Sequence, residues 1–338
     1  MPAMSALPSH PDLLWRPLRL SDFPAVAHLV GRSNAHDETP IVWTEAEVEH
    51  DLVRPDMVLE RDTIAGFDED GELRAFGLVD ARSGASRLLR IMLWGDVDPA
   101  WRRRGIGTAV LRWSEEAGSR RLAEQGAGID PAVPRLLALF TEDRLEDRAA
   151  LFRSQGYEPV RFYADMGRPL DEPLPDTPSA DGVRIAPWTL ELDDATRDAH
   201  NEAFLDHWGS EPNTPDEWRH HHRDSPAFRG DLSRLALDGD RVVGYVVVHR
   251  FAEEDELLGM RVAWLGSIGV RRAYRRRGIA SALIVATLAA FREAGLERAD
   301  LGVDADNPTG AFGLYERLGF RTLRRNTMFG RYLPAADR

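Results

Sequence analysis

The sequence contains no cysteine and no lysine. The absence of cysteine excludes disulfide bonds, thiolate nucleophiles, iron–sulfur clusters and cysteine-ligated zinc sites together. Because lysine is absent, all 43 basic residues are arginines, and the Gly-Lys-Ser/Thr phosphate loop of nucleotide triphosphatases is excluded. We attribute the arginine bias to the codon usage of a GC-rich genome and assign it no function.

The chain also lacks long apolar runs and a surplus of positive charge. No stretch approaches the roughly 18 consecutive apolar residues of a membrane-spanning helix, so we predict no membrane partner. The formal net charge of −13 argues against a nucleic-acid partner, which requires a basic face, and favours amine partners. Residues 1–10 lack a basic region followed by an apolar core, so we expect no secretory signal and a cytoplasmic protein.

Two similar halves make up the 338 residues. Residues 168–182 are rich in Pro, Asp and Ser, which is typical of a linker. An Asp-Gly pair at residues 70–71 and another at 238–239 predict a tight hairpin in each half, because glycine supplies the positive φ that such a turn requires. We therefore predict a tandem duplication, with an N-terminal domain at residues 1–167 and a C-terminal domain at residues 183–338.

The predicted elements follow the same order in both halves. Each half begins with a short strand and helices, continues with antiparallel strands, and ends strand–helix–strand–helix–strand. This order predicts a mixed α/β fold, in which a mostly antiparallel sheet is flanked by helices. The helix expected at residues 281–294 has little polar surface, so we expect it to pack on a sheet.

An arginine-rich turn follows the strand that ends at Val270 and precedes that helix. The first amides of a helix have no acceptor within the helix, and Gly278 and Ala280 keep bulky side chains away from them. Together with the helix dipole and the arginines, these amides predict a phosphate or pyrophosphate site. Three arginines in a row are by themselves typical of a solvated surface, but here they occur twice between a strand and a helix. We discount a dinucleotide-binding fingerprint in the first half, because Val110 occupies the position where that fingerprint needs a small residue.

Two motifs of the C-terminal half resemble signatures of the GCN5-related N-acetyltransferase (GNAT) superfamily. Residues 275–280, Arg-Arg-Arg-Gly-Ile-Ala, resemble its Arg/Gln-x-x-Gly-x-Gly/Ala motif. Residues 307–320 resemble its second signature, Asn-x-x-(x)-Ala-x-x-Leu-Tyr-x-x-x-Gly-Phe. The resemblance covers residues 183–335 and, in weaker form, residues 12–167. It implies a tandem duplication of the acyl-CoA N-acyltransferase fold.

The resemblance further implies an N-acetyltransferase that uses acetyl-CoA. The cofactor would lie between two splayed strands, with its pyrophosphate on the arginine-rich turn and its thioester carbonyl facing a backbone amide. Tyr315 would lie near the sulfur as a general acid, a role that a phenol can fill. The residues that the resemblance implies for the cofactor are Ile268, Gly269, Val270, Arg275, Arg276, Arg277, Gly278, Ile279, Ala280, Ser281 and Asn307.

The first half keeps the turn but not the second signature. Phe152 stands where the second half has Tyr315, and Arg144 where it has Asn307. A phenyl ring donates no proton, so we predict that the N-terminal domain is non-catalytic. Whether it binds acetyl-CoA or only supports the second half stays open. The residues that would bind the cofactor there are Val97, Arg102, Arg103, Arg104, Gly105, Ile106, Gly107 and Thr108.

The acceptor is predicted only by class, as a small-molecule primary amine. The tandem arrangement resembles that of mycothiol synthase, so a cysteinyl amine is the alternative acceptor. Trp264 stands where that enzyme has an acid, and the general base therefore stays unassigned. A non-catalytic CoA-binding module is a second alternative. In the segment 203–218 we favour helices packed by Trp208 and Trp218 over a substrate pocket. We predict no metal site and expect His220, His221 and His222 at the surface, because consecutive helical residues point in different directions.

Overall fold

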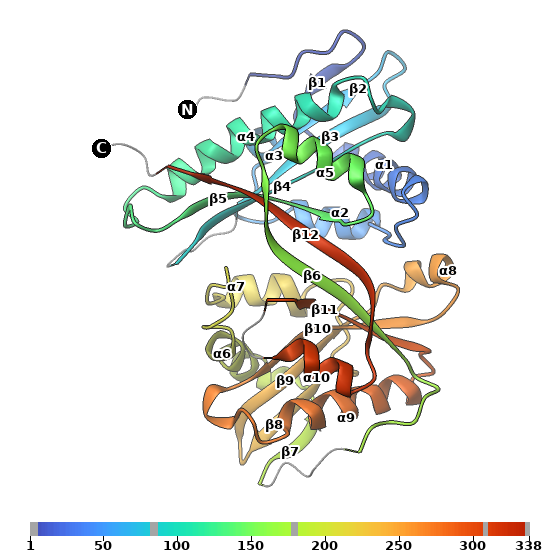
Figure 1. The fold of residues 1–338 in the computed structure, drawn as a ribbon, viewed down its shortest axis with the longest axis vertical. Helices are drawn as coiled ribbons and strands as arrows, with labels where there is room; N and C mark the ends of the chain where they lie inside the picture. Colours follow the sequence, from blue (N-terminus) through green and yellow to red (C-terminus); the bar gives the residue numbers. More distant parts are fainter. Residues whose placement is uncertain (1–5, 82–86, 177–181, 307–309, 335–338) are drawn as a thin grey trace. The chain divides into compact units, whose positions relative to one another are not determined.

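The computed structural model describes residues 6–81, 87–176, 182–306 and 310–334 (Figure 1). The chain forms two compact units, one of Met1–Arg161 with Asn326–Arg338 and the other of Phe162–Arg325. Each unit has a mostly antiparallel sheet with helices packed on both faces, so the predicted α/β fold class and the duplication are confirmed. Among the described residues, no helix is long and apolar enough to cross a membrane.

In the first unit the strands pair in the order β1-β2-β3-β4-β5, antiparallel except for β4 with β5. One apolar core lies between this sheet and α1 and α2, and another between the sheet and α4 and α5. Its elements are β1 (Leu14–Arg16), α1 (Phe23–His36), α2 (Glu45–Leu52), α3 (Leu59–Asp62), β2 (Thr63–Phe67), β3 (Leu73–Ala81), β4 (Leu89–Val97), α4 (Ile106–Gln125), β5 (Arg135–Glu142) and α5 (Glu146–Ser154).

The second unit repeats this plan with the order β7-β8-β9-β10-β11, antiparallel except for β10 with β11. Helices α9 and α10 cover one core, and α6 and α7 cover the other. Its elements are β7 (Arg184–Pro187), α6 (Asp193–Ala203), α7 (Pro215–Trp218) with a π-helical turn (Arg219–Arg223), β8 (Arg234–Asp238), β9 (Arg241–His249), α8 (Asp255–Leu258), β10 (Val262–Val270), α9 (Ile279–Glu293), β11 (Arg298–Asp304) and α10 (Ala311–Arg317).

Both predicted hairpins are present. Gly71 follows β2 with a φ of 80°, and Gly239 follows β8 with a φ of 57°, which are the positive values that the Asp-Gly pairs predict. The strand after each turn is apolar at nearly every position, because alternate side chains enter the cores on the two opposite faces of the sheet. In β9, for example, Val243, Val246 and Val248 enter one core, and Val242, Tyr245 and Val247 enter the other.

A strand from the other half of the sequence closes each sheet. Residues 326–333 of β12 (Arg321–Leu333) pair antiparallel with β5 in the first unit. Residues 163–169 of β6 (Glu158–Pro169) pair antiparallel with β11 in the second. The compact units therefore differ from the predicted domains 1–167 and 183–338, which follow sequence order. Local sequence patterns predict that a strand forms but not which distant strand pairs with it.

The predicted linker at residues 168–182 also begins within a strand, because Arg168 and Pro169 belong to β6. Arg168 is buried, and its guanidinium donates hydrogen bonds to the carbonyl oxygens of Leu318 (2.8 Å) and Pro173 (2.7 Å). These bonds attach the end of β6 to α10 and to the following segment within the second unit. The proline-rich composition did not indicate this buried anchor.

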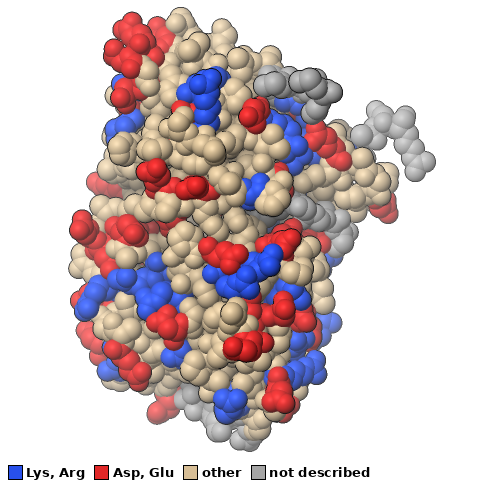
Figure 2. Space-filling model, turned by 180° about the vertical axis from the view of Figure 1, so that it is seen from behind, with Lys and Arg blue, Asp and Glu red and all other residues tan. Residues whose placement is uncertain are grey.

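Arginine and acidic side chains are interspersed over the face drawn in Figure 2. Arginines of the chain form ion pairs within their own unit; Arg298, for example, lies 2.7 Å from the buried Asp300. On the face drawn in Figure 2, positive charge is therefore interspersed with negative charge and not gathered into one patch.

Candidate active site

Strands β10 and β11 separate beyond Trp264. They pair in parallel where Val262–Trp264 lies beside Arg298–Asp300, and no further pair joins them within the described residues, although β10 continues to Val270. Backbone groups on the facing edges of the two strands are therefore open to hydrogen-bond a ligand. We call residues 265–270 the free arm of β10; Ile268, Gly269 and Val270, which the resemblance assigns to the cofactor, lie on it.

A β-bulge interrupts β10 at Gly266, where its register with β9 shifts between Leu265 and Ser267. A bulge takes one residue out of the hydrogen-bonded ladder, so its backbone amide is available to another acceptor. Gly266 is exposed, and a β-carbon there would lie 2.3 Å from Nδ1 of His249, so this position excludes a side chain. The sequence prediction missed this residue, although a glycine within an apolar strand is a signal for a bulge.

The turn after β10 has the backbone geometry of an anion site. Arg276 and Gly278 both have positive φ angles, 61° and 76°, and α9 begins at Ile279 without a side-chain cap. The first amides of α9, at Ile279, Ala280 and Ser281, are therefore directed out of the helix end towards any bound anion. The helix dipole adds about 0.3–1 kcal/mol per negative charge near this end.

The three arginines of this turn differ in their surroundings. Arg275 donates from its guanidinium to the carbonyl oxygens of Val270 (3.3 Å) and Ala203 (2.7 Å), and it lies 3.3 Å from the Asp206 carboxylate. Arg275 thus joins the end of β10 to the end of α6, a function that the motif did not predict. Arg276 is exposed, and the Arg277 guanidinium lies 5.2 Å from the centre of the Tyr274 ring.

Tyr315 lies in α10 and belongs to the core beneath β10 and α9. Its side chain is largely buried beside Phe320, and burial raises the pKa of its phenol to about 12. The hydroxyl is therefore protonated at neutral pH, as a hydrogen-bond donor must be. The Tyr315 phenol also lies near enough to Tyr245 to contribute to the raised pKa of that residue, whose main cause is burial. Asn307, the other predicted residue of this motif, lies outside the described residues.

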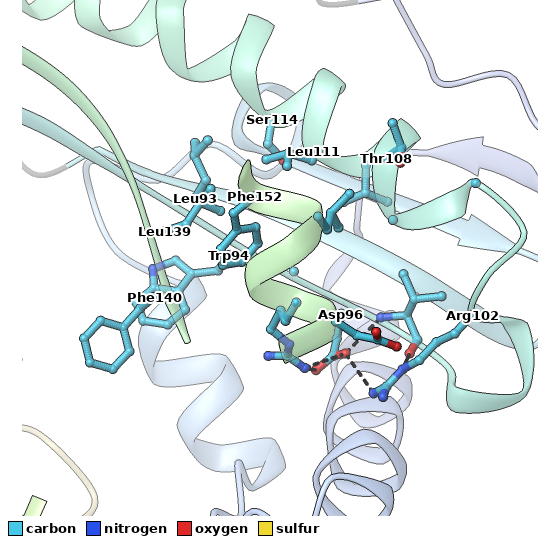
Figure 3. A pocket seen from close by; sticks show the side chains of 18 of the residues that line it. Leu93, Trp94, Asp96, Arg102, Thr108, Leu111, Ser114, Leu139, Phe140 and Phe152 are labelled. Carbon is cyan, nitrogen blue, oxygen red and sulfur yellow. Dashed lines mark hydrogen bonds and ion pairs between the residues drawn. The ribbon is translucent and has the colours of Figure 1, made fainter. Parts of the chain in front are cut away.

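The first unit contains a cavity of about 410 Å³ at the equivalent place between β4 and β5. Figure 3 shows Arg102 and Asp96 at one end of it and Phe140 at the other. The residues predicted for this half that line the cavity are Val97, Arg102, Arg103, Gly105, Gly107 and Thr108. The turn repeats that of the second unit, because Arg103 and Gly105 have φ angles of 64° and 82°. Ile106 is buried in the core of the first unit.

Three features distinguish this cavity from the site in the second unit. The pairing of β3 with β4 runs from Ala75–Val97 to Ala81–Ile91 without a register shift, so β4 has no bulge at this place. Phe152, in place of a tyrosine, packs edge-on against Phe329 at a centroid distance of 5.6 Å.

The third feature is an additional arginine, Arg148, in the charge network at the cavity wall. Arg102 donates to Asp37 (2.6 Å) and to the Ser33 hydroxyl (2.6 Å), much as Arg275 bonds to α6 in the second unit. Arg148 lies 3.3 Å from Asp37 and 3.3 Å from Asp96. The Arg104 guanidinium, predicted for the cofactor, lies 4.8 Å from the Trp101 ring centre.

Comparison with known proteins agrees with this geometry. Residues 193–320 match the model of the acetyltransferase (GNAT) family. The chain is 32% identical to a mycothiol acetyltransferase of Salinispora tropica over 66% of this chain and 67% of that protein, and 30% identical to one of Mycolicibacterium vanbaalenii over 77% and 80%. The chain belongs to the GNAT family. Like other GNAT enzymes, it is an N-acetyltransferase that uses acetyl-CoA.

Solved GNAT structures agree with the tandem fold. A GCN5-related N-acetyltransferase of Sphaerobacter thermophilus is 26% identical, with a TM-score of 0.73 over 96% of this chain and 97% of that one. A tandem GNAT protein from the clavulanic acid pathway, 16% identical with a TM-score of 0.66 over 96% and 100%, shows the same fold. The expected GNAT superfamily membership is thus confirmed for the chain as a whole.

The opposite face of the GNAT sheet, covered by α6 and α7, holds polar groups that the sequence analysis did not assign. Tyr245 of β9 hydrogen-bonds His200 of α6 and Ser267 of β10. Trp218 is buried and donates from Nε1 to Asp193 (2.9 Å), so its predicted packing role is confirmed.

The three consecutive histidines were expected at the surface, and this expectation was wrong, because none of them is fully exposed. His220, His221 and His222 are all partly buried, and the His222 ring lies 4.2 Å from that of Trp218 by ring centroids. All three lie within a π-helical turn, Arg219–Arg223, and the sequence analysis did not predict this wider winding.

Proposed function

We propose that the second unit transfers the acetyl group of acetyl-CoA to the primary amine of a small molecule, and that the first unit binds acetyl-CoA without catalysing transfer. The observation that carries this proposal is the bulge at Gly266, which lies on the free arm of β10 and has no equivalent in β4. An amide outside the ladder can stabilise the negative charge that develops on the thioester oxygen, and such a donor contributes about 10²–10³-fold to rate.

The roles of the other groups follow from their surroundings. The amides at the start of α9, with Arg276, bind the pyrophosphate. Tyr315 hydrogen-bonds the sulfur as negative charge develops there, and its raised pKa of about 12 keeps the donor proton in place at neutral pH. The resemblance also assigns Asn307, which lies outside the described residues, to the cofactor. The first unit has the phosphate-binding turn and the cavity but lacks the bulge and the phenol.

A cysteinyl amine is the second candidate acceptor. It is favoured by the similarity of this chain to mycothiol acetyltransferases, with which it shares 28–32% sequence identity. Trp264, at the position where the resemblance implies an acid, argues against an identical acceptor site. The alternative of a non-catalytic CoA-binding module has no support from these acetyltransferase relatives.

The experiment is release of free CoA from acetyl-CoA with a panel of amines: glucosamine, the desacetyl form of mycothiol, S-methyl-L-cysteine amide and a peptide with a free N-terminus. Product mass identifies the acetylated nitrogen. We expect at least one small amine to be acetylated and the double variant Arg276→Glu/Gly278→Val to be inactive, because valine is strained at the positive φ of Gly278. Acetylation of the peptide alone would contradict the proposed acceptor class.

A further inference from the structure

A chain of three hydrogen-bonded side chains begins next to the bulge of the second unit. Ser267 directly follows Gly266, and its hydroxyl lies 2.9 Å from the hydroxyl of Tyr245. The Tyr245 hydroxyl lies 2.6 Å from Nδ1 of His200. Tyr245 is fully buried, and it fits beneath β10 only because Gly269 has no side chain: a β-carbon there would lie 2.5 Å from the Tyr245 ring.

The protonation states give this chain a direction. Burial, together with the nearby His207, lowers the pKa of His200 to about 4, so the imidazole is neutral at neutral pH and one ring nitrogen is an acceptor. Burial raises the pKa of Tyr245, so its hydroxyl stays protonated. In the neutral tautomer that carries its proton on Nε2, Nδ1 is the acceptor, so the Tyr245 hydroxyl, 2.6 Å away, donates to His200 and accepts from Ser267. The Ser267 oxygen then keeps lone pairs for a further donor.

We propose that Ser267, Tyr245 and His200 form the relay that takes the proton from the acceptor amine, an inference that rests on the proposed function. As the amine nitrogen forms its bond to the acetyl carbon, its N–H proton passes to Ser267, the Ser267 proton passes to Tyr245, and the Tyr245 proton passes to Nδ1 of His200. The carbon–sulfur bond breaks, and the thiolate takes a proton from Tyr315. His200 then releases its proton to solvent, and Tyr315 regains one.

The surroundings of His200 suit a proton that is held only briefly. The ring stacks on Phe204 at 4.5 Å and lies 5.2 Å from the ring of Trp218, so it is enclosed by aromatic rings that disfavour a lasting imidazolium. Its low pKa makes it return the proton at the end of the cycle. The titratable groups around it are His207 from the segment after α6, His222 from the π-helical turn, Tyr245 from β9 and, beyond Trp218, Asp193.

Kinetics of variants at each position test the relay, with the amine of the panel that is acetylated fastest as the acceptor. We expect Tyr245→Phe, Ser267→Ala and His200→Gln each to lower kcat by about 10²-fold, the lower end of the range for proton transfer by a positioned group. The KM for acetyl-CoA should change less than about threefold, and Ser267→Thr should restore the rate because it keeps the hydroxyl. Thr287→Val, which removes a buried hydroxyl from α9, is the control and should leave kcat unchanged.

The pH profile separates a relay from a structural role. Above neutral pH the wild-type kcat should be flat, whereas in His200→Gln it should keep rising with pH, because hydroxide replaces the missing internal base. A merely structural defect lowers the rate by the same factor at every pH, and that result would overturn the relay. Wild-type rates in all three variants would overturn it as well.

A measurement without turnover keeps this proposal separate from the proposed function. In ¹⁵N NMR spectra of the histidine-labelled full chain, Nδ1 of His200 should appear as an unprotonated nitrogen that accepts a hydrogen bond, and its resonance should move in Tyr245→Phe. A protonated Nδ1 at neutral pH would exclude the relay even if the enzyme is active. If no amine is acetylated, the proposed function fails, whatever the spectrum shows.

Discussion

The imidazole of His249 lies directly against the α-carbon of Gly266, so that a β-carbon at Gly266 would lie 2.3 Å from Nδ1. This contact makes glycine necessary at the bulge of β10. We expect Gly266→Ala to displace the bulge from His249 and to lower kcat/KM by about 10²-fold or more, as the loss of one oxyanion donor does.

Steady-state kinetics check this prediction against Gly31→Ala. Apart from the chain neighbours and the backbone of α1 itself, no heavy atom lies within 4 Å of a β-carbon at Gly31, so that control should be neutral or slightly stabilising. Equal rates for Gly266→Ala and the wild type would show that the bulge amide takes no part in the reaction.

Tyr315→Phe should lower kcat by about 10²–10⁴-fold and leave the KM for acetyl-CoA within a few-fold, since the ring stays in the core while the donor is lost. Because burial raises the pKa of Tyr315 to about 12, the protonated donor persists in alkaline solution, and wild-type kcat should not fall up to about pH 10. Tyr332→Phe, at a residue 53% exposed in the first unit, is the control. Wild-type turnover by Tyr315→Phe would refute its role.

Arg275 and Arg276 should respond differently to the same change. Arg275→Gln removes bonds between β10 and α6, so the free energy of unfolding should fall by about 1–3 kcal/mol in urea titrations. Arg276→Gln should leave stability unchanged and raise the KM for acetyl-CoA, because this side chain is exposed and its proposed role is to bind the pyrophosphate. The opposite pattern would mean that the assignment of the two arginines is reversed.

Two molecules of acetyl-CoA should bind per chain in isothermal titration calorimetry. Gly105→Val should reduce the number to one and leave turnover intact, because valine is strained at a φ of 82° and only the turn of the first unit is affected. A single site in the wild-type chain would instead support the alternative that the first unit only stabilises the second.

Acid should destabilise the second unit through two histidines. Burial lowers the pKa of His200 and of His249 to about 4, below the unfolded value of about 6.5, so the unfolded state binds more protons between these values. Stability contributed by these groups is therefore present above about pH 6.5 and is lost as the pH falls towards 4. Each histidine should cost about 2 kcal/mol of the free energy of unfolding between pH 7 and pH 5.

Denaturant titrations at the two pH values measure this loss. The double variant His200→Gln/His249→Gln should show a smaller difference between pH 7 and pH 5 than the wild type. An unchanged difference would show that neither histidine is buried in its neutral form.

Local signals in the sequence predicted much of this structure. The Asp-Gly pairs fixed two hairpins, and the repeated arginine turns located both helix N-termini, because these features depend on neighbouring residues alone. The exchange of β6 and β12 between the sheets, the partners of Arg275 and the bond from Tyr245 to His200 could not be predicted, since each joins residues far apart in the chain.

A crystal structure of the full chain with a non-hydrolysable acetyl-CoA analogue tests the central claim most directly. The account predicts the pyrophosphate on the first amides of α9, the acyl oxygen on the backbone at Gly266 and the Tyr315 hydroxyl beside the atom that replaces sulfur. A second unit without analogue at saturating concentration, or an acyl group that points away from Gly266 and Tyr315, would contradict it.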